Sequence, residues 1–398
     1  MIPFIPGLTL CGDFYREAVR PILDDAFPRL AHSAGLIGSG SEVLGFDDEM
    51  STDHHWGPRV QLFLDEDDHM LAADAIHDAL AERLPYTFRG YSTNFSEPDP
   101  TDNGVQHLAV LQSGPINHRV SVSTIRGFVR DYLGYDICTP LTTADWLTFP
   151  QQKLRTLTAG AVYHDGIGLT PHPTPPQIGE GTVSTPPPIW GRPGGGEKLL
   201  GLEDMRARFA WYPQDVWLYL LAAGWARIGQ EEHLMGRAGL VGDELGSGLM
   251  GSRLVRDVMR LAFAMGRVYA PYPKWFGTAF SQLDCAVELT PHLRAAQTAP
   301  TWQERESHLV PAYESLARMH NRLGLAEPLP ETTRQFFGRP FQVIALHGFA
   351  DALLAQIADP DVRRIASRQP IGSIDLFSDN TDLLEGTNWR PVFRQLWQ

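Results

Sequence analysis

Alternating apolar and polar residues divide the first part of the chain into helices and strands. Apolar residues recur at helical spacing in residues 9–27, where Pro21 predicts a kink, and again in residues 66–84. Strands are predicted for residues 34–37, 59–64, 105–112 and 119–125. Strands that alternate with helices in this way are typical of a small α/β or α+β domain.

The second half of the chain is dominated by apolar residues at helical spacing. Helical patterns cover residues 204–228, 240–269, 301–323 and 341–357, which predicts a helical bundle packed on the first domain. We therefore expect an α+β fold, with a mixed-sheet domain first and a helical bundle second. The tail segment at 371–384 is predicted to be irregular.

A segment rich in proline and glycine separates the two halves. Residues 171–197 contain too much Pro and Gly for a regular helix or a central strand. The segment is interpreted as a loop or linker, and the alternative is a lid that covers a substrate. The predicted organisation is a domain at 1–150, a linker at 151–200 and a helical domain at 201–398.

Charge and composition restrict the classes of partner. The 398 residues include 33 Lys and Arg and 47 Asp and Glu, for a net charge of −14, which disfavours nucleic acid and anionic membranes as partners. Three dispersed cysteines argue against a disulfide framework or a cysteine-based zinc site. The first ten residues lack the basic region of a signal peptide, so we expect a cytoplasmic protein.

The residues from Leu36 to Leu64 carry the clearest candidate chemistry. An apolar strand leads into Gly38 and Ser39, and Asp53 is expected at the mouth of the next strand. Glycine lets the backbone approach a phosphate, serine adds a hydroxyl donor, and an aspartate can hold a divalent cation. Taken from the residues alone, the same pattern also fits an ordinary turn and helix cap.

The chain resembles the DUF4037 family, a branch of the nucleotidyltransferase superfamily. The resemblance rests on the stretches GSEVLGFDDEMSTDHHWGPRV, NHRVSVSTIRGFVRDYLG, WYPQDVWLYLLAAGW, YAPYPKWFGTAF and IGSIDLFSDNTD. It implies a nucleotidyltransferase-like N-terminal domain followed by helices that shape the acceptor site. It further implies ATP as co-substrate, Mg²⁺ as cofactor, and transfer of a nucleotide monophosphate to a hydroxyl or amine. Gly38 and Ser39 would then cradle the triphosphate.

The sequence departs from the active pattern of that superfamily at two places. The acid pair reads Asp53-His54-His55, so His55 occupies the position of the second carboxylate. The strand expected to supply a third carboxylate offers Ser121 and Ser123 instead. Asp53 and His55 remain the predicted metal ligands, although Mg²⁺ prefers oxygen and imidazole suits softer metals. His55 is alternatively a general acid or base, or a solvated loop residue.

Other candidate residues lie outside the glycine-serine turn. Arg59 is predicted to contact phosphate or to form a structural ion pair, and Lys274 to contact phosphate or to cover an apolar surface. Arg253, Asp257 and Arg260 share one helix face by their spacing. They form either an ion-pair ladder or a wall of the acceptor pocket, in which Asp257 would be the general base for the attacking hydroxyl.

Three functions are consistent with these residues. The first is nucleotidyl transfer from ATP to a small-molecule hydroxyl or amine, catalysed by Asp53, His55 and Asp257. The second is binding of a nucleotide or metabolite without transfer, on a degenerate nucleotidyltransferase fold. The third is acid/base chemistry around His55 in specialised metabolism. Nucleotide binding requires that the turn at Ser39 and the residue Asp53 converge in space.

Overall fold

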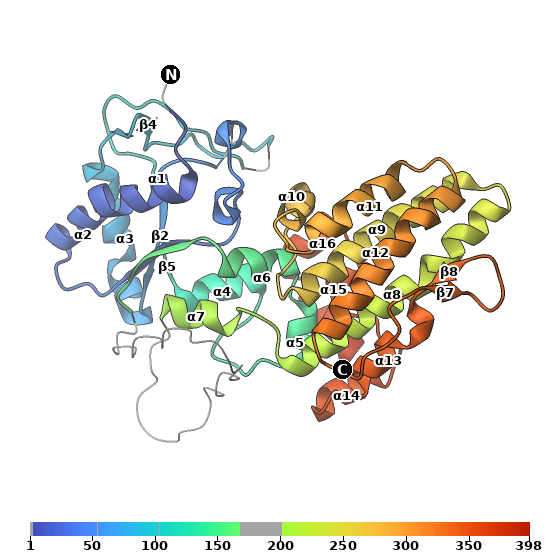
Figure 1. The fold of residues 1–398 in the computed structure, drawn as a ribbon. Coiled ribbons are helices and arrows are strands. Elements are labelled where there is room, and N and C mark those ends of the chain that lie inside the picture. The colour runs from blue at the N-terminus through green and yellow to red at the C-terminus, as the bar shows by residue number, and fades with distance from the viewer. Residues whose placement is uncertain (1–2, 54, 103, 168–200) are drawn as a thin grey trace. The chain divides into compact units, whose positions relative to one another are not determined.

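The computed structural model describes residues 3–53, 55–102, 104–167 and 201–398. The predicted loop at 171–197 and the histidine at position 54 lie outside the described residues. The chain divides into two compact units (Figure 1). The first unit contains residues 1–128 and 159–208, and the second contains residues 129–158 and 209–398. Residues 129–158 belong to the helical unit, whereas the sequence pattern placed 129–150 in the first domain and 151–158 in the linker.

A small mixed sheet forms the centre of the first unit. Its strand order is β5-β2-β1-β6, with β2 and β5 parallel and the other pairs antiparallel. The strands are β1 (Ser33–Leu36), β2 (Arg59–Leu64), β5 (Arg119–Thr124) and β6 (Ala161–Asp165). The predicted strand at 105–112 is wrong, because this segment makes only isolated bridges, such as the one between Phe95 and Leu108.

Helices pack their apolar sides against this sheet. The N-terminal helical stretch is continuous and consists of α1 (Gly7–Phe14), the π-helical η1 (Tyr15–Val19) and α2 (Arg20–Ala26). Helix α3 (Glu66–Arg83) begins at Asp65, whose side chain accepts a hydrogen bond from the Asp68 N–H. Leu62 of the sheet, Phe14 of α1 and Leu80 of α3 are fully buried in one core.

Short elements complete the first unit. They are the 3₁₀ helices η2 (Glu42–Leu44) and η3 (Glu49–Asp53), the hairpin strands β3 (Thr87–Phe88) and β4 (Tyr91–Ser92), and α7 (Leu202–Arg208). Helix α4 (Ile125–Leu133) spans the boundary between the two units in the sequence.

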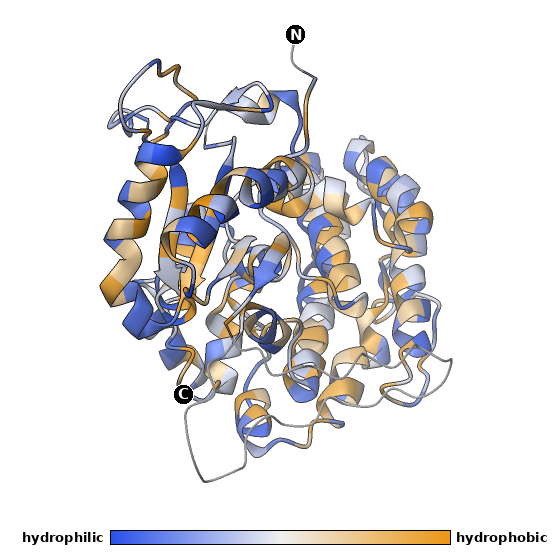
Figure 2. Cartoon of the chain, turned by 90° about the vertical axis from the view of Figure 1, so that its left-hand side faces the viewer, coloured by the Kyte–Doolittle hydropathy of each residue, from blue (hydrophilic) through white to orange (hydrophobic). Residues whose placement is uncertain are grey.

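Long helices that run side by side form the second unit (Figure 1). They are α8 (Gln214–Leu240), α9 (Glu244–Met265), α11 (Ala286–Thr298) and α12 (Trp302–Arg322). Hydrophobic and hydrophilic residues both occur along the helices of the chain (Figure 2). The first half of α8 is buried on nearly all sides, from Val216 to Trp225. The helix predicted for 204–228 is interrupted before α8, because Pro213 cannot continue a helix from the preceding residue.

Shorter elements surround these helices. They are α5 (Thr143–Thr148), α6 (Gln151–Thr158), η4 (Pro273–Trp275), α10 (Phe276–Phe280), β7 (Arg334–Gln335), β8 (Gln342–Val343), η5 (Ala345–His347), α13 (Phe349–Leu354), α14 (Pro360–Ala366), α15 (Ile374–Phe377), α16 (Thr381–Glu385), α17 (Arg390–Arg394) and η6 (Gln395–Trp397). The single helix predicted for 341–357 is therefore wrong, and the tail holds short helices rather than irregular chain.

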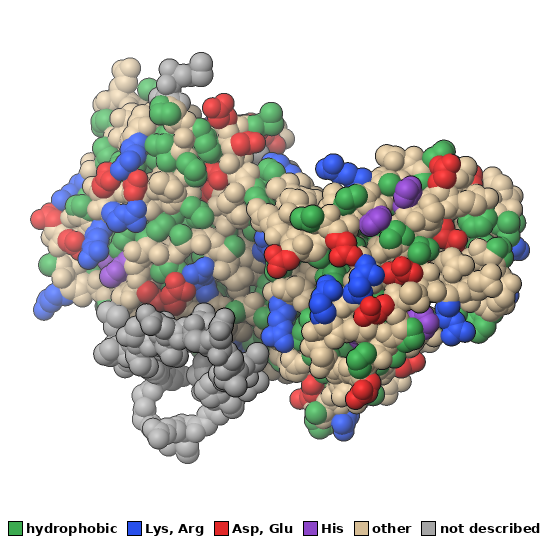
Figure 3. Space-filling view, viewed as in Figure 1, with side chains coloured by type: hydrophobic (Ala, Val, Ile, Leu, Met, Phe, Trp, Pro, Cys, Tyr) green, Lys and Arg blue, Asp and Glu red, His purple; other side chains and the backbone are tan. Residues whose placement is uncertain are grey.

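The surface of the helical unit carries basic and acidic side chains intermixed (Figure 3). No helix in the described ranges is both long enough and apolar enough to cross a bilayer. The architecture is thus α+β, with a small mixed sheet followed by a helical C-terminal region.

Candidate functional site

The turn after β1 is held tightly against the start of β2. The Gln61 side chain accepts a hydrogen bond from the Ile37 N–H at 2.9 Å and donates one to the Ile37 carbonyl at 3.0 Å. Gly38 is buried and has a φ of 84°, a backbone conformation that favours glycine. Ser39 is exposed, so its hydroxyl is accessible at this end of the sheet.

Arg59, the first residue of β2, lies beside the same turn. Its guanidinium donates to the Ser39 carbonyl at 3.1 Å and forms an ion pair with Glu42, a residue that is only 4% exposed. Gly40 fits between these two side chains, because an added Cβ would lie 2.6 Å from Glu42 Oε2 and 2.7 Å from Arg59 Nη2. Arg59 thus forms the structural ion pair, one of the two roles predicted from the sequence.

His55 is positioned by Arg119 rather than by another acid. Its backbone N–H donates to the Gln106 carbonyl, and its Nδ1 lies 2.9 Å from Arg119 Nη1. Arginine can only donate, so Nδ1 is the acceptor and the neutral ring carries its proton on Nε2. Arg119 starts β5 directly opposite Arg59 in the parallel register. Burial, and then the nearby Arg59 charge, lower the pKa of Arg119.

Asp53 lies at the end of η3, not on a strand. Its side chain is exposed, and β2 begins only at Arg59. The expected arrangement, in which the acid projects from the mouth of β2, is therefore not the one observed. The turn at Gly38 and Ser39 does meet Arg59, and the register of β2 and β5 brings Arg119 and His55 to the same end of the sheet.

The donor atoms around Asp53 and His55 do not fit Mg²⁺. The His55 Nδ1 lone pair is engaged by Arg119, and the guanidinium places a positive charge where a second cation would bind. Mg²⁺ also requires oxygen ligands in near-octahedral geometry. Within the described ranges, no group of three or more His, Cys, Asp or Glu side chains could hold a metal ion. We therefore derive no step through a metal at this position.

The helical unit contains a pocket of about 240 Å³. All of its lining residues belong to that unit. Its polar wall includes Gln151, Arg256, Asp257, Arg260, Asp375 and Asp379. Its apolar wall includes Leu220, Leu261, Ala264, Phe276, Leu376 and Leu384. A concave, mostly apolar pocket with a few convergent polar groups is the usual form of a small-molecule site.

Asp257 is the most unusual group in this wall. It is 2% exposed, and neither carboxylate oxygen receives a hydrogen bond from the residues that the structure describes. The Nε atoms of Arg227 and Arg256 lie 3.5 Å away, close enough for an ion pair but without a hydrogen bond. Burial raises the pKa of Asp257, against the lowering effect of Arg256, Arg227 and Arg260.

The neighbouring charged groups are mostly paired. Arg256 Nη1 donates to Asp379 at 2.8 Å. Asp375 is half-buried and accepts hydrogen bonds from the Gln151 N–H and the Ser373 hydroxyl. Burial raises the pKa of Asp375 to about 6, although these hydrogen bonds and the Arg260 charge oppose the rise.

The remaining sequence candidates lie outside the pocket wall. Arg253 donates to Glu231 at 2.8 Å and is not part of the pocket wall. Of the three residues predicted to share a helix face, only Asp257 and Arg260 line the pocket. Lys274 is exposed, with its ammonium 4.9 Å from the centre of the Trp275 ring. Sequence reasoning missed Arg119 and Gln151, because the partners that define their roles come from distant parts of the chain.

Comparison with known proteins bears on the helical unit. A family model described as Domain of unknown function (DUF4037) matches residues 197–276, a range that includes α8, α9, Asp257 and Lys274. No curated protein and no solved structure matches the chain. The match supports the DUF4037 family for this chain through residues 197–276, whereas the nucleotidyltransferase relation stays a prediction.

Proposed function

We propose that the chain binds a small organic molecule in the pocket of its helical unit, through a hydroxyl or amine that donates a hydrogen bond to Asp257. The observation that carries this proposal is the buried Asp257 carboxylate, which lies in a pocket wall and receives no hydrogen bond within the described part of the chain. The proposed activity is binding without metal-dependent nucleotidyl transfer.

An unsatisfied carboxylate at this depth needs an explanation. Burial of a polar group without a hydrogen-bond partner costs about 1–3 kcal/mol, and more for a charged group. The flanking guanidinium groups of Arg227 and Arg256 compensate the charge of Asp257 but not its hydrogen-bonding capacity. A ligand O–H or N–H beside the carboxylate would supply the missing donor, after a small movement of the side chain toward the pocket.

The residues around Arg59 and Arg119, at one end of the sheet in the first unit, support binding more than nucleotidyl transfer. Glu42 already neutralises Arg59, and Arg119 engages His55. Neither contact assists a metal-bound phosphate. Nucleotidyl transfer, which the family resemblance implies, therefore enters the test as a rival outcome.

The test uses two simple probes, isoamyl alcohol and isoamylamine, which place one hydroxyl or one amine on a small apolar body. Ligand-observed NMR of the full chain is expected to show binding of both. Ala264→Phe, which fills the pocket wall, should abolish binding. Leu249→Phe adds an aromatic ring to an exposed position of the same helix and should leave binding unchanged.

Two results would contradict the proposal. One is the absence of binding by either probe, and the other is binding that Ala264→Phe does not reduce. A parallel incubation with ATP and Mg²⁺ addresses the rival function, because release of pyrophosphate in the presence of either probe would demonstrate nucleotidyl transfer.

A further inference from the structure

We infer that the ligand of this pocket is a small amino acid with an apolar side chain, held by its amine at Asp257 and by its carboxylate at Arg260. The inference rests on the proposed function and names the class of molecule that the pocket takes.

Arg260 lines the pocket and has no side-chain partner within the described ranges. Among the described residues, its side chain makes no hydrogen bond and no ion pair within 4.0 Å. Burial lowers the pKa of Arg260, as does the neighbouring charge of Arg256. Asp375, Asp257 and Asp379 raise the pKa of Arg260 only from beyond ion-pair distance. Asp375 accepts a hydrogen bond from Gln151, and Asp379 accepts one from Arg256.

Three other arginines of α8 and α9 near the pocket are paired. Arg227 donates to Glu231 at 3.0 Å, Arg253 donates to the same carboxylate, and Arg256 donates to Asp379. Arg260 thus differs from its neighbours in having its donors available. The planar guanidinium matches a carboxylate in a two-point hydrogen bond, which makes a carboxylate the natural partner.

The two unsatisfied groups are complementary and adjacent. Asp257 and Arg260 are three residues apart on α9, a spacing that places their side chains side by side on one helix face. Asp257 requires a donor, whereas Arg260 requires an acceptor. An amino acid supplies both from neighbouring atoms and adds no net charge, so neither ion of the ligand is buried without a partner.

The rest of the pocket fits an apolar side chain. Leu220, Leu261, Phe276 and Leu376 contribute apolar surface next to the charged wall. The volume of about 240 Å³ is below the range of about 300–1,000 Å³ that is typical for drug-sized ligands, which indicates a smaller molecule. A branched aliphatic amino acid combines this size with the required charges.

The experiment compares leucine with two probes that each lack one of its charges. Isoamylamine lacks the carboxylate, and isocaproate lacks the amine. NMR titration of the full chain is expected to show that leucine binds more tightly than either probe by about tenfold or more. Arg260→Gln should remove most of the advantage of leucine over isoamylamine while changing the affinity for isoamylamine by less than about twofold.

Arg253→Gln is the matched control, because it removes the same charge from the same helix outside the pocket wall. It should leave the affinities for leucine and isoamylamine unchanged. Binding of isoamylamine by Arg260→Gln also shows that the variant is folded.

The outcomes separate this inference from the function on which it rests. If isoamylamine binds in the pocket but leucine binds no more tightly, the amino-acid assignment is overturned and the proposed function stands. An equal loss of both affinities in Arg260→Gln also overturns the assignment. If none of the compounds binds, both the assignment and the proposed function fail.

Discussion

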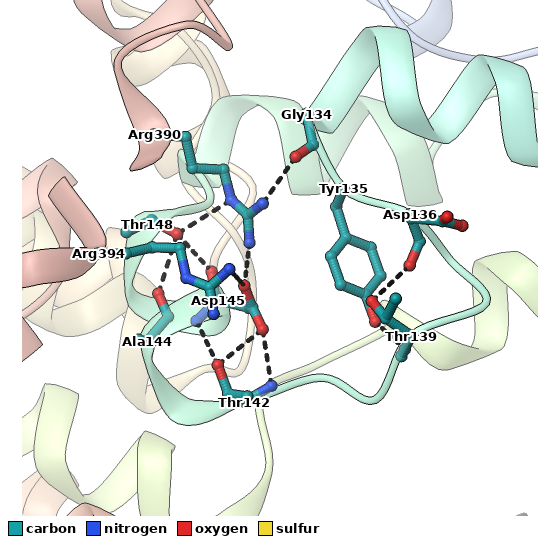
Figure 4. A network of polar contacts seen from close by, with 10 residues as sticks. All are labelled: Gly134, Tyr135, Asp136, Thr139, Thr142, Ala144, Asp145, Thr148, Arg390 and Arg394. Atoms are coloured by element: carbon teal, nitrogen blue, oxygen red, sulfur yellow. Dashed lines mark hydrogen bonds and ion pairs between the residues drawn. The ribbon is translucent and has the colours of Figure 1, made fainter. Parts of the chain in front are cut away.

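Arg390 forms an ion pair with Asp145 in which the arginine side chain is 9% exposed and the aspartate side chain 3%. The same guanidinium donates to the Gly134 carbonyl at 2.7 Å and to Thr148 Oγ1 at 3.1 Å (Figure 4). It also lies 4.5 Å from the centre of the Phe149 ring. These contacts attach helix α17 to helix α5 and to the loop that precedes α5.

Arg390→Met should be strongly destabilising. The substitution leaves Asp145 buried with fewer partners, and removal of one member of a buried ion pair costs about 3–5 kcal/mol. Arg394→Met is the control, because Arg394 is more exposed and lies 3.4 Å from the same carboxylate, a contact worth about 0–1 kcal/mol. Urea denaturation followed by circular dichroism measures both free energies, and equal losses would show that burial of Arg390 is unimportant.

The close approach of α8 and α12 depends on Gly239. A Cβ added at this position would lie 2.3 Å from the Trp302 Cβ. Rotation of the tryptophan ring cannot relieve this clash, because the Cβ does not move with the ring. Gly239→Ala should therefore lower the free energy of unfolding by about 1–3 kcal/mol.

Gly248→Ala on α9 provides the comparison for this prediction. The one atom within 4 Å of its added Cβ is Arg305 Nη2 at 3.6 Å, so alanine should be tolerated and should stabilise the helix by up to about 1 kcal/mol. Equal thermal stability of the Gly239→Ala variant and the wild type would refute the packing argument.

The elements that the sequence predicted correctly have strong local signals. Residues 66–84 were predicted as a helix, and α3 occupies Glu66–Arg83. Residues 301–323 were likewise predicted as a helix, and α12 follows Thr301, whose side chain accepts a hydrogen bond from the Glu304 N–H. In both cases the apolar period and the cap agree with the tertiary packing.

Elements defined by long-range contacts were less accessible to sequence reasoning. The apolar residues from 105 to 112 resemble a strand, but they lie along a loop that pairs only at isolated points. The pocket joins Gln151 to Asp375, which are 224 residues apart, and no local pattern reports that contact. The spacing along the helix identified Asp257 and Arg260 as neighbours. It could not show that Arg253 pairs with Glu231 outside the pocket, because Glu231 lies on another helix.

Mg²⁺ should have little effect on the wild-type protein. The Arg119 guanidinium engages His55 Nδ1, so millimolar Mg²⁺ should change the melting temperature by less than about 1 °C. His55→Asp combined with Arg119→Gln restores an oxygen ligand two residues after Asp53 and removes the guanidinium that would pair with it, so the double variant should show a measurable Mg²⁺-dependent increase.

His107→Asp changes the same residue type at an exposed position and serves as the control for the Mg²⁺ measurement. It should show no Mg²⁺-dependent increase. A large stabilisation of the wild type by Mg²⁺ that disappears in Asp53→Asn would show that the observed donor set does hold the metal.

The stability of the helical unit should depend on pH through Glu232 of α8. Glu232 is 3% exposed, and its carboxylate accepts hydrogen bonds from the N–H groups of Ile344 at 2.8 Å and Ala345 at 3.2 Å. Burial raises the pKa of Glu232 to about 7, against the lowering effect of these two hydrogen bonds. The folded state therefore retains a proton that the unfolded state loses at lower pH, so stability falls as the pH rises toward 7.

Comparison with Glu232→Gln isolates the contribution of Glu232 to the pH dependence of stability, since glutamine does not titrate. Relative to the variant, the wild type should lose about 3 kcal/mol as the pH rises from about 4.5 to above 7. Glu288→Gln tests the opposite sign, because hydrogen bonds from Ser315 and Arg318 lower the pKa of Glu288 below its usual value near 4.5. Relative to that variant, the wild type should lose stability as the pH falls below about 4.5, and the difference should be constant at higher pH. Unfolding measured from acid pH to above 7 should therefore show the two differences with opposite slopes, on opposite sides of about pH 4.5. A Glu232 difference that stays constant or rises with pH would mean that the folded protein does not hold this carboxyl in its protonated form.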